Sequence, residues 1–258
     1  MTATLRYECR MMLRKRSMWI ALGVITLLLA GSSAAQWREL FHDGDARRVM
    51  GSVALLLNIF LPAGYGCLIA DRLVRDGKLG VAPVLDATPA SPAGRLAGKY
   101  LGVCAAVVLP MAVLYAGWTV PYAAATGGWP AVGWALAGFA TVLLPAVLVV
   151  GAFALAVPLL IPAPLFRVLF VGYWFWGNSI TADVMPTLAQ SVLTPIGAYP
   201  LALFGVEGVI AGPQPGATLN FLRPEVTTAT AGLSIGLLLV LAALTLCAAH
   251  AVRARTTR

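Results

Sequence analysis

Few residues in this 258-residue chain have the types and spacing that chemistry requires. A phosphate-binding loop needs the pattern GxxxxGK followed by Ser or Thr, because backbone amides and the lysine hold the phosphates. The nearest segment is 93–100, AGRLAGKY, in which Ala93 replaces the first glycine and Tyr100 replaces the magnesium-binding hydroxyl. We therefore expect no catalytic residue, no ATP site and no bound cofactor in this chain. Any ATP and magnesium would be bound by a partner subunit.

Histidines and acids are also poorly placed for catalysis. His42 lies on the outer side and His250 at the inner end of the last predicted span, so they cannot share a metal ion and we expect no metal site. An ion-coupled carrier usually keeps an ionisable residue at mid-depth in the membrane. No long apolar run contains such an acid, since Asp183 and Glu207 fall between runs. This argues against an ion-coupled secondary carrier, which stays an alternative.

The longest charged, turn-rich interval is 71–99, which has long apolar runs on both sides. Thr88 precedes Pro89 and is pushed out of the helical region. Ser91 followed by Pro92 has the residue types of a helix N-cap and first helical position. We expect a helix, a short exposed helix and a further helix. The aliphatic side chains offered to a partner outside the bilayer would be Leu79, Val81, Val84 and Leu85.

Composition identifies the environment of these elements. The chain is 60% hydrophobic and 11% charged, with a mean hydropathy of +0.85, whereas soluble domains carry about 25% charged residues. We therefore predict an all-α polytopic membrane protein. The net charge of +8 does not indicate nucleic acid, because all but four of the 18 lysines and arginines fall on one side of the predicted membrane. This positive-inside bias places both termini in the cytoplasm.

The expected elements form one transmembrane domain over 1–258. Residues 2–16 are amphipathic and basic, which favours an interfacial elbow helix on the lipids of the cytoplasmic leaflet. The predicted spans are about 18–35, 49–70, 100–123, 132–157, 166–180 and 226–251, with kinks at Pro110 and Pro145. Segment 181–224 is broken by prolines, and a seventh span there would move the basic C-terminus outside. We therefore predict short re-entrant helices on the outer side for 181–224.

Some polar and aromatic side chains within the predicted spans are candidates for a substrate pathway. An apolar path would suit an amphipathic or lipid-like substrate better than a strongly hydrated solute. For the aromatic cluster 173–176 an interfacial belt or core packing is the alternative to a role in a central cavity. The candidate lining residues are Asn58, Trp174, Trp176 and Asn178.

The loop resembles the cytoplasmic loop of type-2 ABC exporter permeases. The residues that carry the resemblance are, in order, Asp71-Arg72, Gly77, Leu85, Thr88-Pro89, Ser91, Leu96 and Gly98-Lys99. In that family the loop carries a coupling helix, which inserts into a groove of the ATP-hydrolysing subunit. The resemblance implies that Leu79, Val81, Val84, Leu85, Thr88 and Pro89 dock on an ATPase, with Arg72, Arg75 and Asp86 as charges at the rim.

The same resemblance implies an assembly and a location. Two permease chains, identical or homologous, would form the pathway in a bacterial cytoplasmic membrane. Two copies of an ABC ATPase would bind below them and supply the energy for exporting a drug, peptide or lipid. The chain itself would not be an enzyme. A membrane scaffold or sensor without transport is the alternative from another class.

Overall fold

The computed structural model describes residues 2–32, 44–75, 79–80, 91–181, 184–217 and 219–256. These residues are all-α and include no strand. The elements are α1 (Thr2–Leu13), α2 (Arg16–Ser32), α4 (Ala46–Ile69), α7 (Pro92–Thr126), α8 (Pro130–Gly138), the π-helix η1 (Phe139–Leu143), α9 (Leu144–Ala156), the 3₁₀-helix η2 (Val157–Leu159), α10 (Ala163–Ser179), α11 (Ala198–Leu203), the 3₁₀-helix η3 (Asn220–Leu222) and α12 (Thr228–Thr256).

Four helices in the described part of the chain are long and apolar enough to cross a membrane. They are Ala46–Ile69, Pro92–Thr126, Pro130–Leu159 and Thr228–Arg255. Even the shortest, with 24 residues, is about 36 Å long at 1.5 Å per residue, against a hydrocarbon core of about 30 Å. A multi-pass membrane protein is therefore plausible. The remaining two predicted spans coincide with α2 and α10, which have 17 residues each and reach about 25 Å.

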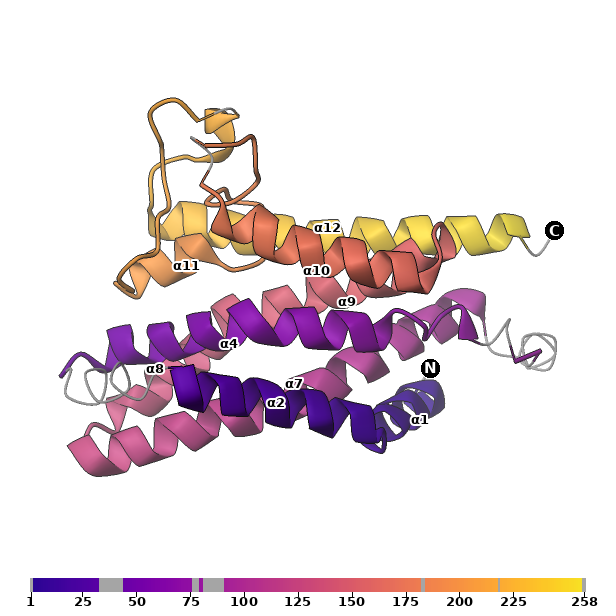
Figure 1. Cartoon of the computed structure of the whole chain (residues 1–258), viewed down its shortest axis with the longest axis horizontal. Coiled ribbons are helices and arrows are strands. Elements are labelled where there is room, and N and C mark those ends of the chain that lie inside the picture. The colour runs from indigo at the N-terminus through magenta and orange to yellow at the C-terminus, as the bar shows by residue number, and fades with distance from the viewer. Residues whose placement is uncertain are drawn as a thin grey trace.

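The long helices run in roughly the same direction, and the two ends of the bundle differ (Figure 1). Helix α1 and both chain termini lie at one end, which we call the inner end because the positive-inside bias predicts that it faces the cytoplasm. Helix α11 and the segment around it lie at the other, outer end. Both ends of the chain thus lie on one side of the bundle.

Burial separates central from peripheral helices. The Pro130–Leu159 helix has 67% of its apolar window buried, whereas Thr228–Arg255 has 17%. Helix α9 packs against α4, α7 and α12, as expected for a helix that is apolar on all sides. Helix α4 contributes Val49, Val53 and Leu57 to the same core. Most of the α12 surface is therefore available to lipid or protein.

Local sequence signals explain both ends of α7. The Ser91 side chain accepts a hydrogen bond from the Gly94 amide at 3.1 Å, and Pro92 occupies the first turn. At the other end Gly127 adopts a left-handed conformation with φ +66°, which glycine does at little cost. The predicted N-cap at Ser91 is confirmed, and Gly127 accounts for the end of the helix at Thr126.

The predicted kink at Pro145 corresponds to a π-helix. Proline lacks an N–H donor and its ring crowds the carbonyl one turn earlier. Immediately before Pro145, the Leu144 amide bonds the Phe139 carbonyl, five residues back. The wider turn accommodates the proline, and the helix continues through α9 instead of ending.

The outer segment is less helical than the sequence predicted. Within 184–217 and 219–227 the helical elements are α11, with six residues, and η3, with three. The irregular backbone is held by buried polar contacts, as backbone near membrane depth requires. Arg223 is 1% exposed and donates to the carbonyls of Thr187 at 2.8 Å and Ala189 at 3.0 Å. Tyr199 donates to the Pro224 carbonyl at 2.8 Å.

Candidate functional site

The predicted docking loop is described only in part. Val81, Val84, Leu85, Asp86, Thr88 and Pro89 lie outside the described residues. Leu79 is 60% exposed and Arg75 is exposed at the inner end. An exposed leucine beside a basic residue suits a protein contact, and the docking role of all these residues stays a prediction.

Arg72 does not lie at an exposed rim, as the sequence led us to expect. It is 2% exposed, and its Nη1 atom lies 3.4 Å from Oε2 of Glu8. The reason is that α1 packs against α7 and brings Glu8 to the guanidinium. Sequence reasoning missed this contact because Glu8 is 64 residues away in the chain.

Glu8 also pairs with a lysine at the start of α7. Lys99 Nζ lies 3.3 Å from Glu8 Oε1, and the side chains of Glu8, Arg72 and Lys99 are all at least 93% buried. Since removing either partner of a buried ion pair leaves an uncompensated charge, such contacts hold their elements in fixed positions. Glu8 of α1 therefore connects the end of α4 to the beginning of α7, which are the two ends of the 71–99 loop.

Close packing of α1 on α7 places this carboxylate. A Cβ atom added at Gly102 would lie 2.6 Å from the Leu5 carbonyl oxygen and 2.9 Å from the Glu8 Cβ. Glycine alone permits that approach. Met12 of α1 is fully buried, whereas Arg6 and Arg10 on its other side are exposed. The predicted amphipathic elbow helix is thus a helix with one buried side.

A second ion pair ties α10 to α4 at the inner end. Arg167 near the start of α10 pairs with Asp71, and its Nε donates to the Cys67 carbonyl at 3.1 Å. This pair is about half exposed, so its energetic contribution is modest. It nevertheless fixes which polar groups face the space between α2, α4 and α10.

That space contains two adjoining cavities. The larger, of about 610 Å³, lies between α2, α4 and α10; its polar end is formed by Lys15, Asp71 and Arg167, and its apolar wall includes Phe60 and Phe175. The smaller, of about 350 Å³, is lined by Lys15, Asp71, Arg72, Arg75 and Leu79. The two share Lys15 and Asp71, so a basic region at the inner end continues into an apolar one.

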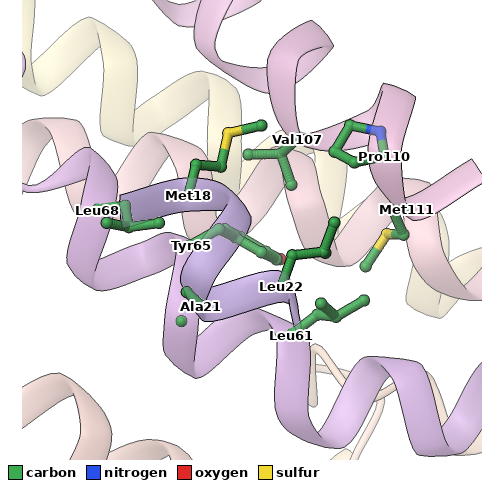
Figure 2. A pocket seen from close by; sticks show the side chains of 10 residues that line it. Met18, Ala21, Leu22, Leu61, Tyr65, Leu68, Val107, Pro110 and Met111 are labelled. Atoms are coloured by element: carbon green, nitrogen blue, oxygen red, sulfur yellow. The ribbon is translucent and has the colours of Figure 1, made fainter. Parts of the chain in front are cut away.

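A third space between α2, α4 and α7 is a packing void. Figure 2 shows its apolar side chains, among them Met18, Leu61 and Met111, around Tyr65. Its volume is about 30 Å³. A buried water needs two to four polar partners, and the lining is almost wholly apolar. This space joins α2 to the bundle and is too small for a ligand.

The predicted pathway residues lie mostly at packing contacts. Asn58 is fully buried, and its Nδ2 donates to the carbonyls of Pro195 and Ile196 at 3.0 Å each. Trp174 is 2% exposed and donates to the Ile59 carbonyl at 2.8 Å. These contacts join α4 to α10 and to the outer segment. A role in transport for either residue stays a prediction.

Asn178 and Trp176 differ from each other in exposure. Asn178 donates to the Trp174 carbonyl and accepts from the Thr194 hydroxyl at 2.9 Å, whereas Trp176 is 42% exposed on α10. Sequence reasoning missed Phe60, whose ring centroid lies 6.5 Å from that of Phe175. Phe175 belongs to the predicted aromatic cluster, but only the packing of α10 on α4 identifies Phe60 as its neighbour.

The segment that most resembles a phosphate-binding loop is helical. Residues 93–100 form the first turns of α7, and Lys99 pairs with Glu8. Across the described parts of the chain, no group of three or more His, Cys, Asp or Glu residues could hold a metal ion. No family model matches the sequence, and no curated protein matches it.

Proposed function

We propose that the chain is the membrane-spanning permease subunit of an ATP-driven exporter of the type-2 ABC kind that its loop resembles. The observation that carries the proposal is the contact of Glu8 with both Arg72 and Lys99. A force applied to the loop by a partner would move α1 with the ends of α4 and α7, because the buried charges connect them. A mechanical input at the inner end is what such a transporter needs.

In this proposal α2 and α10 also cross the membrane, which makes six crossings. Each reaches about 25 Å, and a span somewhat shorter than the bilayer is accommodated by local thinning or by flanking residues that reach the interface. Both helices pack along α4. The cytoplasmic placement of both termini is supported by the charge bias and by their position at the same end of the bundle.

The proposed assembly contains two ABC ATPase subunits, which bind ATP and magnesium, and a second permease chain, identical or homologous. It would lie in a bacterial cytoplasmic membrane. The substrate would be amphipathic or lipid-like, because the larger cavity joins a basic end to an apolar wall. A strongly hydrated solute would lose too much hydration along that wall.

Affinity purification from native membranes in mild detergent tests the docking role. The wild type should retain an ATPase subunit that mass spectrometry identifies by its phosphate-binding loop. Leu79→Asp and the double variant Val84→Asp/Leu85→Asp should lose it. Phe221→Asp is the matched control, since Phe221 is equally apolar and 78% exposed at the outer end. Retention by all variants would contradict docking through this loop.

The alternatives predict different results. An ion-coupled carrier would sustain flux after ATP depletion as long as an ion gradient remained, and a scaffold or sensor would show no flux in reconstituted vesicles. ATP-dependent flux that requires the co-purified ATPase supports the exporter. Flux that persists without ATP would overturn it.

A further inference from the structure

The smaller cavity at the inner end carries an excess of positive charge. Its charged lining consists of Lys15, Arg72, Arg75 and a single acid, Asp71. Asp71 already pairs with Arg167, and Glu8 already pairs with Arg72 and Lys99. Among the residues that the structure describes, the charges at this space therefore sum to a net positive value even after Asp71 and Glu8 are counted.

Arg72, which lines this space, has hydrogen-bond donors that no described residue uses. The residue is 2% exposed, and only its Nη1 reaches Glu8. Its Nε and Nη2 atoms are buried and have no hydrogen-bond partner among the described residues. Buried donors without acceptors are costly, and a guanidinium edge fits the oxygens of a phosphate or carboxylate. An anion beside Arg72 would supply the acceptors that the described residues do not.

The surroundings of Lys15 would also favour a bound anion. Within the described part of the chain its ammonium group makes no ion pair or hydrogen bond. Burial lowers the pKa of Lys15, the positive charges of Arg72, Arg75 and Arg167 lower it further, and Asp71 opposes them. A bound anion would offset this repulsion between neighbouring cations.

The larger cavity, which has an apolar wall, limits which kind of anion would fit the whole site. The larger cavity shares Lys15 and Asp71 with the smaller one and extends between α2, α4 and α10 to Phe60 and Phe175. A free phosphate or nucleotide would use only the basic part. A lipid would place a phosphate at the basic end and an acyl chain along the apolar wall, at the depth where each belongs in a bilayer.

We propose that the two cavities together bind a phosphate-bearing lipid of the inner leaflet, with the phosphate on Lys15, Arg72 and Arg75 and an acyl chain beside Phe60 and Phe175. The site does not depend on the exporter proposal. It would serve equally as a substrate entrance or as a stabilising lipid site, because only binding is inferred.

Native mass spectrometry of the purified full chain, titrated with dioleoyl phosphatidylglycerol, tests the site. Lys15→Gln/Arg75→Gln should weaken binding by about tenfold or more, since each basic residue near a phosphate contributes on the order of 1 kcal/mol. Arg6→Gln/Arg10→Gln removes the same charge from the exposed side of α1 at the same end and should change binding less than about twofold. Arg72 is left intact because of its contact with Glu8. Arg75→Gln alone, at an exposed side chain, replaces the double variant if the latter unfolds.

Two further arms separate the lipid from other anions. Wild-type protein should bind dioleoyl phosphatidylglycerol more tightly than the dihexanoyl form, and Phe175→Ala should reduce that difference. Inorganic phosphate should not displace the long-chain lipid. Equal weakening by both charge variants would reduce the site to general surface electrostatics, and equal affinity for long-chain lipid and inorganic phosphate would identify a soluble anion; either result overturns the proposal.

Discussion

Glu8 is the residue whose environment departs most from what its sequence position suggests. It belongs to a short basic helix, α1, yet it is 4% exposed and lies between two cations. A carboxylate removed from water persists only when it is paired and hydrogen-bonded. Its two partners come from different helices, so the stability of the inner end depends on this one side chain.

We expect Glu8→Gln to destabilise the protein by about 3–5 kcal/mol, because two buried cations would lose their counter-charge. Thermal unfolding in detergent measures the change. Glu207→Gln is the control: its pair with Arg48 at 3.2 Å is 85% exposed on the Glu207 side, and such surface pairs contribute at most about 1 kcal/mol. Equal effects of both substitutions would show that the inner pair is not a buried network.

The Asn58 side chain of α4 holds the outer segment through two hydrogen bonds. Replacing it with leucine removes two hydrogen bonds to the Pro195 and Ile196 carbonyls, at a cost of about 1–3 kcal/mol for the acceptors left buried. We expect faster hydrogen exchange of residues 184–217 in Asn58→Leu. Ser52→Ala is the control, since that hydroxyl bonds only the Arg48 carbonyl within α4. Impaired transport with unchanged exchange would instead favour the pathway role.

Helix α1 is positioned by a glycine. In Gly102→Ala the new methyl group would lie 2.6 Å from the Leu5 carbonyl, so α1 must move away from α7, at a cost of about 1–3 kcal/mol. We expect faster hydrogen exchange throughout residues 2–13. Gly117→Ala lies on the same helix with nothing within 4 Å and should be neutral or slightly stabilising. Unchanged exchange in Gly102→Ala would refute the close packing.

Elements were predictable where the information is local. The spans expected at 49–70, 100–123, 132–157 and 226–251 coincide with long apolar helices, because hydropathy and caps act within a few residues. The outer segment was not predictable in the same way. Its shape depends on Arg223, which bonds carbonyls 34 and 36 residues away, and no local pattern marks an arginine for that role.

At the scale of the whole molecule, the proposed six membrane crossings require that α10 cross the membrane. In a cysteine-free background, Gly128→Cys and Phe221→Cys should react with a membrane-impermeant maleimide on intact cells, and Leu160→Cys should react only after lysis. Leu160 and Phe221 are exposed and Gly128 is partly exposed, and the three positions flank the Pro130–Leu159 helix and α10. Labelling of Leu160→Cys and Phe221→Cys under the same condition would mean that α10 does not cross.

The candidate site was predictable only in outline. Charge and turn patterns directed attention to 71–99 and to a basic elbow helix, and α1 and the described ends of that segment lie at the inner end. The identity of the contacts followed from packing. Arg72 was expected at an exposed rim and is buried against Glu8. Phe60 and Lys15 line the same cavity, which only the packing of α2, α4 and α10 could show.

The position of Glu8 also has a consequence for synthesis. Its carboxylate can leave water only when Arg72 and Lys99 are both present, and Lys99 is translated 91 residues later. Helix α1 should therefore stay accessible to proteases until the segments that carry Arg72 and Lys99 have been synthesised. Ribosome-bound fragments that end at Ser91 should leave residues 2–13 cleavable, and fragments that end at Gly138 should protect them. The first helix to be made is then fixed in place only after α4 and the start of α7 have been made.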